Sequence, residues 1–278
     1  MEIGLKKATG LVEVKSAFES IEENGDEWFS NLLVRDDEIV RWIAKGQVSI
    51  ATTPTTAMLL RQRYGCQRLF FANTRSEVLT SDLQSCFHDL PEKIITTVLE
   101  RNGENRFVKE KLREAGFSHY ALLKRVVKVN EPKAPEKVAA EFANQDDFSH
   151  IEEIIRRYFD PLLDHWPDKD EIDTAIREKR ILVARSEEEG RVIALDSFEQ
   201  TGQTVYNRYV VSMEEYRHQK SYGTFLMGQS IALHAKARRI IGWVKDDNFV
   251  SIHMHNKHGL HFDGATEESF LFNNKCNI

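Results

Sequence analysis

The sequence has few cysteines, no long hydrophobic run and no excess of positive charge. Its three cysteines, Cys66, Cys86 and Cys276, are widely spaced and form no CxxC pair. A disulfide framework and a cysteine-based zinc site are therefore not expected, and a reducing compartment fits. No segment approaches the roughly 18 apolar residues of a membrane-spanning helix, and the N-terminus lacks the apolar core of a signal peptide. We expect a cytoplasmic protein with no membrane span.

The chain has 278 residues, of which 41% are hydrophobic, and a net charge of −6. This length and composition favour two domains, each with its own core. Nucleic-acid binders usually carry a basic stripe, so we expect no nucleic-acid partner. A modest acidic excess is compatible with an amine substrate, although many proteins share it.

An internal repeat is visible in two places. The segment DEIVRWIAKGQVSIA, beginning at Asp37, resembles DEIDTAIREKRILVA, beginning at Asp170, at an offset of 133 residues. Both patterns predict an amphipathic helix that leads into a strand. Asn105 with Gly116 matches Asn248 with Gly259, at an offset of 143. Two matches in the same order favour a duplicated α/β unit over coincidence.

Residues 130–138 (NEPKAPEKV) are rich in proline and poor in apolar side chains, which is typical of a linker. We expect domains at 1–130 and 141–278, joined by a linker at 131–140. In the second half, Ser149 and Glu152 predict a capping box that opens a helix. Further elements are expected as follows: a helix over 170–179, strands over 180–186, 191–199 and 204–211, a helix over 222–237, a strand over 239–245, a helix over 247–257 and a strand near 267–272. This order predicts an α/β fold of the α+β type, with a mixed sheet and helices on both faces.

The segment from Tyr206 to Leu226 carries the chemistry. A strand ends at Val211, a short polar loop with Ser221 and Gly223 follows, and a helix then begins. Unpaired N–H groups and the positive end of the helix dipole favour a phosphate at such a junction. Many strand-loop-helix junctions bind nothing, so this pattern alone leaves both interpretations open.

With this loop and the order of its elements, the region 145–272 resembles the GCN5-related N-acetyltransferase (GNAT) superfamily. The family's loop reads Gln/Arg-x-x-Gly-x-Gly/Ala, and here it is His218-x-x-Ser221-x-Gly223, which departs at the first two named positions. The resemblance implies two tandem acyl-CoA N-acyltransferase domains of this fold, with acetyl-CoA or another acyl-CoA as co-substrate and no metal. It implies that backbone amides hold the pyrophosphate and the thioester oxygen. The implied donor-binding residues are Val210, Val211, Gln219, Lys220, Ser221, Tyr222, Gly223, Thr224 and Asn248.

The resemblance also implies the catalytic residues. Many members have a tyrosine seven residues after the asparagine, which protonates the leaving thiolate; here that position is His255, which can also donate a proton. Glu199, at a strand end, is the candidate proton acceptor for the amine, with Asp196 and Tyr209 behind it. The alternatives are a surface histidine and a solvated strand-end charge.

The loop from Asp160 to Asp170 corresponds to the family's acceptor site. Asp164 and Trp166, together with Tyr209, are the candidate substrate-binding residues, because acidic and aromatic groups suit an amine such as an amino sugar or amino acid. The alternative is that these are solvated loop charges. His253, His255, His258 and His261 would allow a metal interpretation, but only His255 and His258 share a helical face, so no metal is expected.

The first half keeps the helix-strand start and the ending at Asn105. The region from Phe71 to Phe87 contains no glycine, and Leu112 stands at the tyrosine position. We therefore expect a degenerate GNAT-like copy, with an unrelated α/β domain as the alternative. The sequence predicts a cytoplasmic N-acyltransferase that acts on a small-molecule amine and leaves a homodimer open. The alternative is a non-catalytic acyl-CoA-sensing or partner-binding protein. A donor on acyl carrier protein is a variant of the first hypothesis.

Overall fold

The computed structural model describes residues 4–22, 27–87, 93–134, 138–217 and 221–273. The chain divides into two compact units: unit 1 comprises residues 1–122 with 266–278, and unit 2 comprises residues 123–265. The expected linker at 131–140 thus falls within the range of unit 2, and the end of the chain belongs to unit 1 rather than to the second half.

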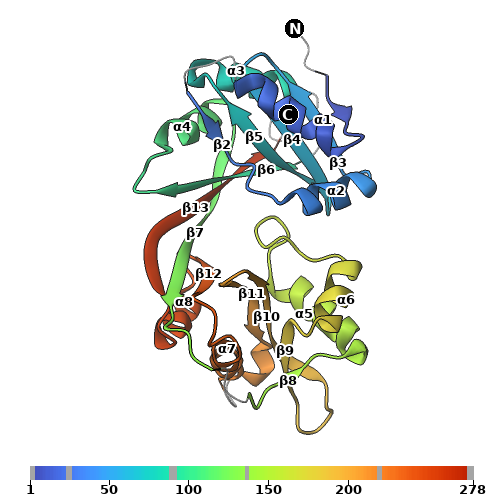
Figure 1. Cartoon of the computed structure of the whole chain (residues 1–278), viewed down its shortest axis with the longest axis vertical. Coiled ribbons are helices and arrows are strands. Elements are labelled where there is room, and N and C mark those ends of the chain that lie inside the picture. Colours follow the sequence, from blue (N-terminus) through green and yellow to red (C-terminus); the bar gives the residue numbers. More distant parts are fainter. Residues whose placement is uncertain (1–3, 23–26, 88–92, 135–137, 218–220, 274–278) are drawn as a thin grey trace. The chain divides into compact units, whose positions relative to one another are not determined.

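Unit 1 contains the first set of elements (Figure 1). They are β1 (Lys6–Lys7), α1 (Leu11–Glu22), β2 (Phe29–Ser30), α2 (Asp36–Ala44), β3 (Val48–Thr52), β4 (Thr56–Arg63), β5 (Cys66–Asn73), α3 (Ser76–Phe87), β6 (Lys93–Arg101) and α4 (Arg106–Glu114). The strands follow the order β1-β3-β4-β5-β6, with β13 (His261–Asn273) next to β6, and β2 pairs with β5.

Unit 2 contains a second set in the same order. They are β8 (Glu141–Phe142), the short 3₁₀ helix Gln145–Asp147, α5 (Phe148–Tyr158), α6 (Lys169–Arg177), β9 (Ile181–Arg185), β10 (Val192–Thr201), β11 (Thr204–Ser212), the 3₁₀ helix Glu214–Tyr216, α7 (Tyr222–Leu233), β12 (Arg239–Lys245) and α8 (Phe249–Lys257). Its strand order is β8-β9-β10-β11-β12-β7. Two long strands, β7 (Ser118–Val129) and β13 (His261–Asn273), each have residues in both units.

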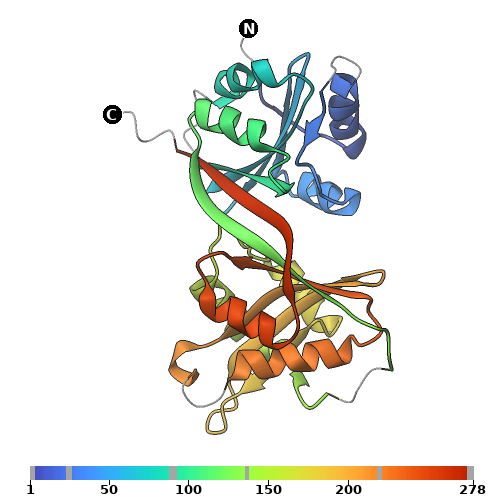
Figure 2. The ribbon, with the colours of Figure 1, turned by 90° about the vertical axis from the view of Figure 1, so that its left-hand side faces the viewer.

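Helices cover both faces of each sheet (Figure 2), which explains why the central strands β4 and β10 are buried along most of their length. In unit 1 the helices α1 and α2 bury Phe18 and Trp42 on one face, and α3 and α4 bury Leu83 and Leu112 on the other. In unit 2 the helices α5 and α6 cover one face, and α7 contributes Leu226 to the core on the other. The predicted mixed-sheet α/β fold is confirmed.

The duplicated unit is visible element by element. Helix α2 and strand β3 correspond to α6 and β9 at an offset of 133 residues, from Asp36 to Lys169 and from Val48 to Ile181. Helix α4 and strand β7 correspond to α8 and β13 at an offset of 143. Between them, α3 and β6 correspond to α7 and β12 at an offset of 146. The two sequence offsets therefore mark structural repeats.

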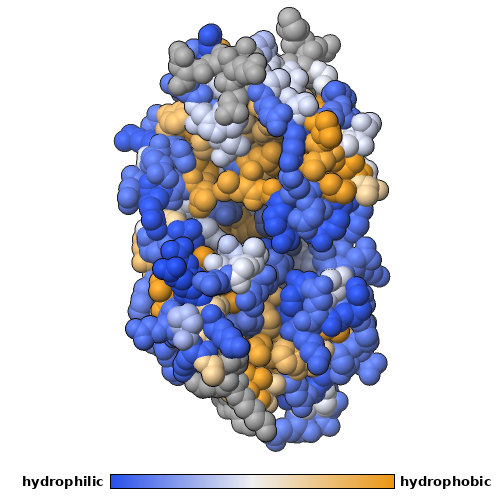
Figure 3. Space-filling model, in the orientation of Figure 1, coloured by the Kyte–Doolittle hydropathy of each residue, from blue (hydrophilic) through white to orange (hydrophobic). Residues whose placement is uncertain are grey.

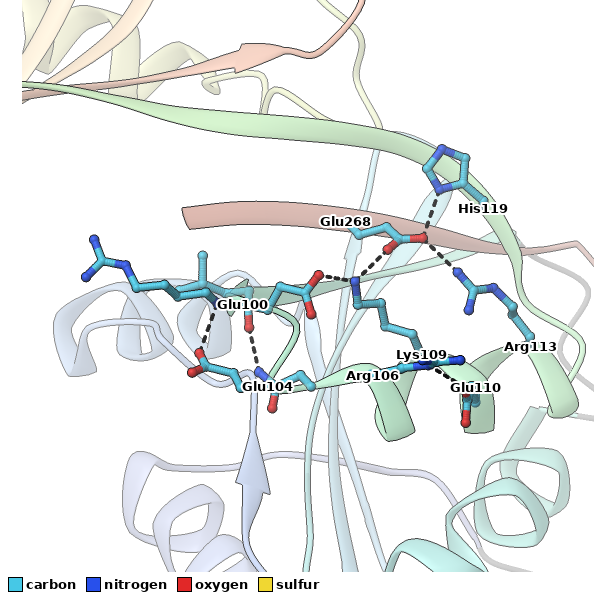
Figure 4. A network of polar contacts seen from close by, with 11 residues as sticks. Glu100, Glu104, Arg106, Lys109, Glu110, Arg113, His119 and Glu268 are labelled. Atoms are coloured by element: carbon cyan, nitrogen blue, oxygen red, sulfur yellow. Dashed lines mark hydrogen bonds and ion pairs between the residues drawn. The ribbon is translucent and has the colours of Figure 1, made fainter. Parts of the chain in front are cut away.

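Strand β13 is longer than the expected strand near 267–272, and its end is held in unit 1 by charge. The Glu268 side chain accepts hydrogen bonds from Arg113 and His119 at 3.0 Å each, and its second oxygen lies 3.0 Å from Lys109 Nζ (Figure 4). Lys109 also bonds the carboxylate of Glu100. Burial alone would raise the pKa of Glu268, but the hydrogen bonds from Lys109 and His119 lower it below its usual value.

The predicted capping box is wrong. Helix α5 begins at Phe148, so Ser149 lies inside it, and the box is formed one turn earlier by Asn144 and Asp147. Asp147 also makes a two-pronged ion pair with Arg185, with N–O distances of 2.6 and 2.7 Å. Its carboxylate therefore serves both the helix start and strand β9.

Candidate functional site

A fork opens in the sheet of unit 2. Strands β11 and β12 pair in parallel only from Thr204 with Arg239 to Tyr206 with Ile241, although both strands continue beyond these residues. From Asn207 onward the facing edges of the two strands diverge. Backbone groups on these edges can therefore bond something other than a neighbouring strand.

Val210 directs its backbone into this fork. Residues of an antiparallel pair alternate between bonding the partner strand and facing away from it. Met213 N donates to Ile193 O at 2.8 Å, which fixes the alternation along the β10–β11 register. By this pattern the amide of Val211 bonds β10, whereas the N–H and C=O of Val210 face the fork. Of the two amides predicted to meet the thioester oxygen, only that of Val210 is so directed.

The first turn of α7 lies at the open end of this fork. The first N–H groups of a helix have no partner within it. The Gly223 N–H donates to Ser212 Oγ at 2.8 Å, and Ser221 is the N-cap residue. Among the described residues, this leaves the amides of Ser221, Tyr222 and Thr224 as donors for an anion. Thr224 O accepts a hydrogen bond from His258 Nε2 at 2.8 Å, so the turn is held by both β11 and α8.

Gly223 lies in a closely packed position, and its φ is outside the left-handed region that favours glycine. A Cβ placed there would lie 3.3 Å from Ser212 Oγ and 3.6 Å from Met254 Sδ. The glycine thus allows α7 to approach α8 and β11 closely. Gln219, Lys220 and His218 lie outside the described residues. Asn248 caps α8 by accepting a hydrogen bond from Ser251 N at 3.0 Å, so its side chain orients that helix.

His255 lies on α8 against β12 and is 5% exposed. Its Nδ1–H donates to Ser251 O at 2.7 Å, and Nε2 would lie 3.0 Å from a Cβ at Gly242. Burial lowers the pKa of His255, so the ring is neutral at pH 7 and presents Nε2 as an acceptor. It is not the surface histidine of the alternative interpretation. It must gain a proton before it can give one.

Glu199 is engaged in ion pairs. Its Oε2 accepts a hydrogen bond from Arg208 at 2.9 Å, and its Oε1 lies 3.8 Å from an Arg180 nitrogen. The carboxylate is thus positioned by guanidinium groups at the end of β10, and this geometry favours a structural charge over a proton acceptor.

The three candidate acceptor residues come together in the structure. Tyr209 is 9% exposed, and its hydroxyl contacts the carbonyls of Asp164 at 2.7 Å and His165 at 2.9 Å. Asp164 accepts from the backbone of Asp160, and Trp166 Nε1 donates to Phe159 O. Tyr209 therefore fixes the loop 160–168 to the strand that borders the fork.

Two residues with buried polar side-chain atoms were not singled out by the sequence as a pair. Asp196 is 0% exposed, and both its oxygens lack a partner among the described residues, as do both polar side-chain atoms of Asn207. Asp196 pairs with Val210, and Asn207 pairs with Phe198, so both belong to the sheet face that α7 covers. Burial raises the pKa of the Asp196 carboxyl well above its usual range. The alternation of a strand alone could not reveal this pair, because the register shifts between Ser197 and Phe198.

Within the described ranges, no group of three or more His, Cys, Asp or Glu side chains is arranged to hold a metal ion. The helices of these same ranges include none with the length and apolar character that crossing a membrane requires.

No family model and no curated protein sequence matches the chain. Solved structures do. The GCN5-related N-acetyltransferase from Sphaerobacter thermophilus has a TM-score of 0.61 at 12% identity, covering 98% of this chain and 96% of that one. A tandem GNAT protein from the clavulanic acid biosynthesis pathway has a TM-score of 0.61 at 9% identity, covering 98% and 99%. An acetyltransferase of the GNAT family from Colwellia psychrerythraea has a TM-score of 0.56 at 10% identity, covering 97% and 100%. The chain therefore has the tandem GNAT fold.

Proposed function

We propose that the chain is an acyl-CoA-dependent N-acyltransferase in which unit 2 holds the donor. The fork between β11 and β12, with the first turn of α7 at its open end, supports this proposal most directly. An extended donor arm fits along the β11 edge, where it meets the N–H and C=O of Val210. The donor's pyrophosphate then lies at the amides of Tyr222 and Thr224, where the helix dipole favours negative charge.

In this proposal the N–H of Val210 stabilises the oxyanion that develops on the thioester carbonyl. The acceptor is a small-molecule amine, such as an amino sugar or amino acid, that enters beside the loop 160–168. His255 takes at Nε2 the proton that the attacking amine loses and delivers it to the departing thiolate sulfur, because its neutral ring is an acceptor first. Glu199 is a positioning residue, because its ion pair with Arg208 ties the end of β10 to β11.

Acetyl-CoA is the donor to test first. At about 100 times its dissociation constant, a bound donor stabilises a protein by about 2.7 kcal/mol. We expect a matching rise of the unfolding midpoint, and release of free thiol when an accepted amine is added. Val210→Pro removes the N–H that faces the fork, whereas Val210→Ala keeps it. The first variant should lose the stabilisation and the second should retain it. Equal shifts in both variants would place the donor elsewhere.

A second function, acyl-CoA sensing without catalysis, is favoured by two specific observations. His255 is enclosed and neutral, and the Glu199 carboxylate is held by Arg208. Stabilisation by acetyl-CoA without thiol release from any amine in a panel would support this alternative. An absence of stabilisation by acetyl-CoA and by longer acyl-CoAs would contradict both functions.

A further inference from the structure

Unit 1 contains a fork that corresponds to the one in unit 2. Strands β5 and β6 pair in parallel only from Cys66 with Lys93 to Leu69 with Thr96, and both then continue apart. Helix α3 follows β5 as α7 follows β11. Phe71 stands two residues before the end of β5, as Val210 stands two residues before the end of β11. The two repeats therefore offer comparable edges.

The fork of unit 1 is occupied by the chain itself. Strand β2 pairs antiparallel with the diverging part of β5, with Phe29 opposite Asn73 and Ser30 opposite Ala72. The next residue continues this pairing, because Asn31 N donates to Phe71 O at 3.1 Å and Phe71 N donates to Asn31 Oδ1 at 2.6 Å. Both backbone groups of Phe71 are thus satisfied within unit 1.

Asn31 closes the narrow end of the fork. Its Nδ2 donates to Thr96 Oγ1 and to Thr97 O on β6, at 2.9 Å each. With the bond from Phe71, its carboxamide joins β5 to β6 at the point where they separate, and the residue is only 7% exposed. Replacing such a buried carboxamide would leave several backbone and hydroxyl groups without partners.

Glu27 lies at the other end of the same segment, next to the start of α3. Its Oε2 accepts a hydrogen bond from Ser76 N, the first residue of α3, at 2.9 Å. This backbone hydrogen bond lowers the pKa of Glu27, so the carboxylate is charged at pH 7. A negative group therefore lies at the start of α3, where the helix dipole favours it.

We propose that the segment Glu27–Asn31 is a built-in occupant of the first repeat's donor site. The Glu27 carboxylate takes the place of a phosphate, and the extended backbone takes the place of the donor arm. The Asn31 carboxamide lies at the closed end of the fork. The chain consequently binds one acyl donor, in unit 2. This inference rests on the proposed function for the identity of the donor, but the occupation of the fork is tested separately.

The apolar surface around this segment offers a matched control. On the face seen in Figure 3, hydrophobic residues gather over the region where Figure 1 labels β2, β5 and β6. Leu33, two residues beyond the occupant, is 71% exposed. Leu33→Ala therefore changes the same stretch of chain without touching the fork.

Hydrogen exchange followed at single amides tests the proposal on the full chain. In the wild type the Phe71 amide should be protected equally with and without acetyl-CoA, whereas the Val210 amide should become protected when acetyl-CoA is added. Asn31→Ala should speed exchange at Phe71 by about tenfold or more, and Leu33→Ala should not. Asn31→Gln keeps a neutral carboxamide but moves it by one methylene, and provides a second variant if Asn31→Ala does not fold.

Three results would overturn the proposal. The Phe71 amide could gain protection from acetyl-CoA, it could exchange freely in the wild type, or it could be indifferent to both Asn31 variants. If acetyl-CoA changes the exchange rate of no amide, then only the proposed function is refuted. The effect of the Asn31 variants on exchange at Phe71 still decides whether the segment occupies the fork.

Discussion

Tyr209→Phe removes one hydroxyl group that fixes the loop 160–168 to β11. The hydroxyl lies 2.7 Å from Asp164 O and 2.9 Å from His165 O, and the residue is 9% exposed. A hydrogen bond of this kind contributes about 1 kcal/mol net to stability. The ring remains and keeps its edge-on contact with Phe159, at 4.9 Å between centroids. The loss should therefore be confined to the loop, at about 1 kcal/mol, or about 3 °C in the unfolding midpoint of a unit of this size.

The loop carries the candidate acceptor residues, whereas the donor path runs along the other edge of β11. We therefore expect Tyr209→Phe to raise KM for the amine while the dissociation constant of acetyl-CoA stays within about twofold. Tyr206→Phe is the matched control, because its ring lies by Arg208 on the same strand, 5.9 Å from the guanidinium carbon. Steady-state kinetics and thermal unfolding of both variants test this reasoning. Equal effects of the two substitutions on stability and on the amine KM would refute it.

Three further predictions concern stability. Burial alone would raise the pKa of Asp147, but the hydrogen bonds from Arg185 lower it. The stability that Asp147 contributes is therefore fully present above its unfolded-state pKa of about 4 and is lost as the pH falls. Asp147→Asn should consequently flatten the acid side of a plot of urea midpoint against pH. Glu268→Gln should destabilise unit 1 by about 2 kcal/mol, because it weakens charged hydrogen bonds in a buried network. Glu110→Gln, on the exposed surface of α4, should destabilise it by only a few tenths of this amount. Gly223→Leu should destabilise unit 2 by about 1–3 kcal/mol through overpacking, whereas Gly223→Ala should be nearly neutral and keep the acetyl-CoA shift.

Each of these has an outcome that contradicts it. An unchanged acid limb in Asp147→Asn would show that the ion pair with Arg185 does not govern acid unfolding. Similar urea midpoints for Glu268→Gln and Glu110→Gln would show that the polar network around Glu268 does not stabilise unit 1. Loss of the acetyl-CoA shift in a stably folded Gly223→Ala would mean that Gly223 serves the donor directly, and not the packing of α7.

The repeats could be predicted from sequence because their signals are local. The amphipathic patterns beginning at Asp37 and Asp170 each fix a helix and the strand that follows, and the structure has both pairs at the predicted offset. Strand 239–245 has the predicted bounds, and β10 and β11 differ from theirs by one or two residues. The beginning of β13 was missed because Asp263 and Gly264, whose φ is +92°, resemble a turn in the sequence.

The arrangement within the forks depends on contacts between distant residues and has no local signal. Asn31 bonds residues that lie 40 and 65 positions away in the chain, and nothing around it marks a buried carboxamide. The family resemblance implied both Val210 and Val211 as donor-binding residues, and only the hydrogen-bond alternation with β10 separates them. His255 was identified by its distance from Asn248, whereas its enclosure against Gly242 depends on packing between α8 and β12.

Calorimetric titration of the full chain with acetyl-CoA tests the central claim most directly, since it counts donor sites. With the fork of unit 1 occupied and that of unit 2 open, we predict one acetyl-CoA bound per chain in the wild type and in Val210→Ala, and none in Val210→Pro. Two equivalents per chain, or unchanged binding by Val210→Pro, would contradict the assignment of a single donor site to unit 2.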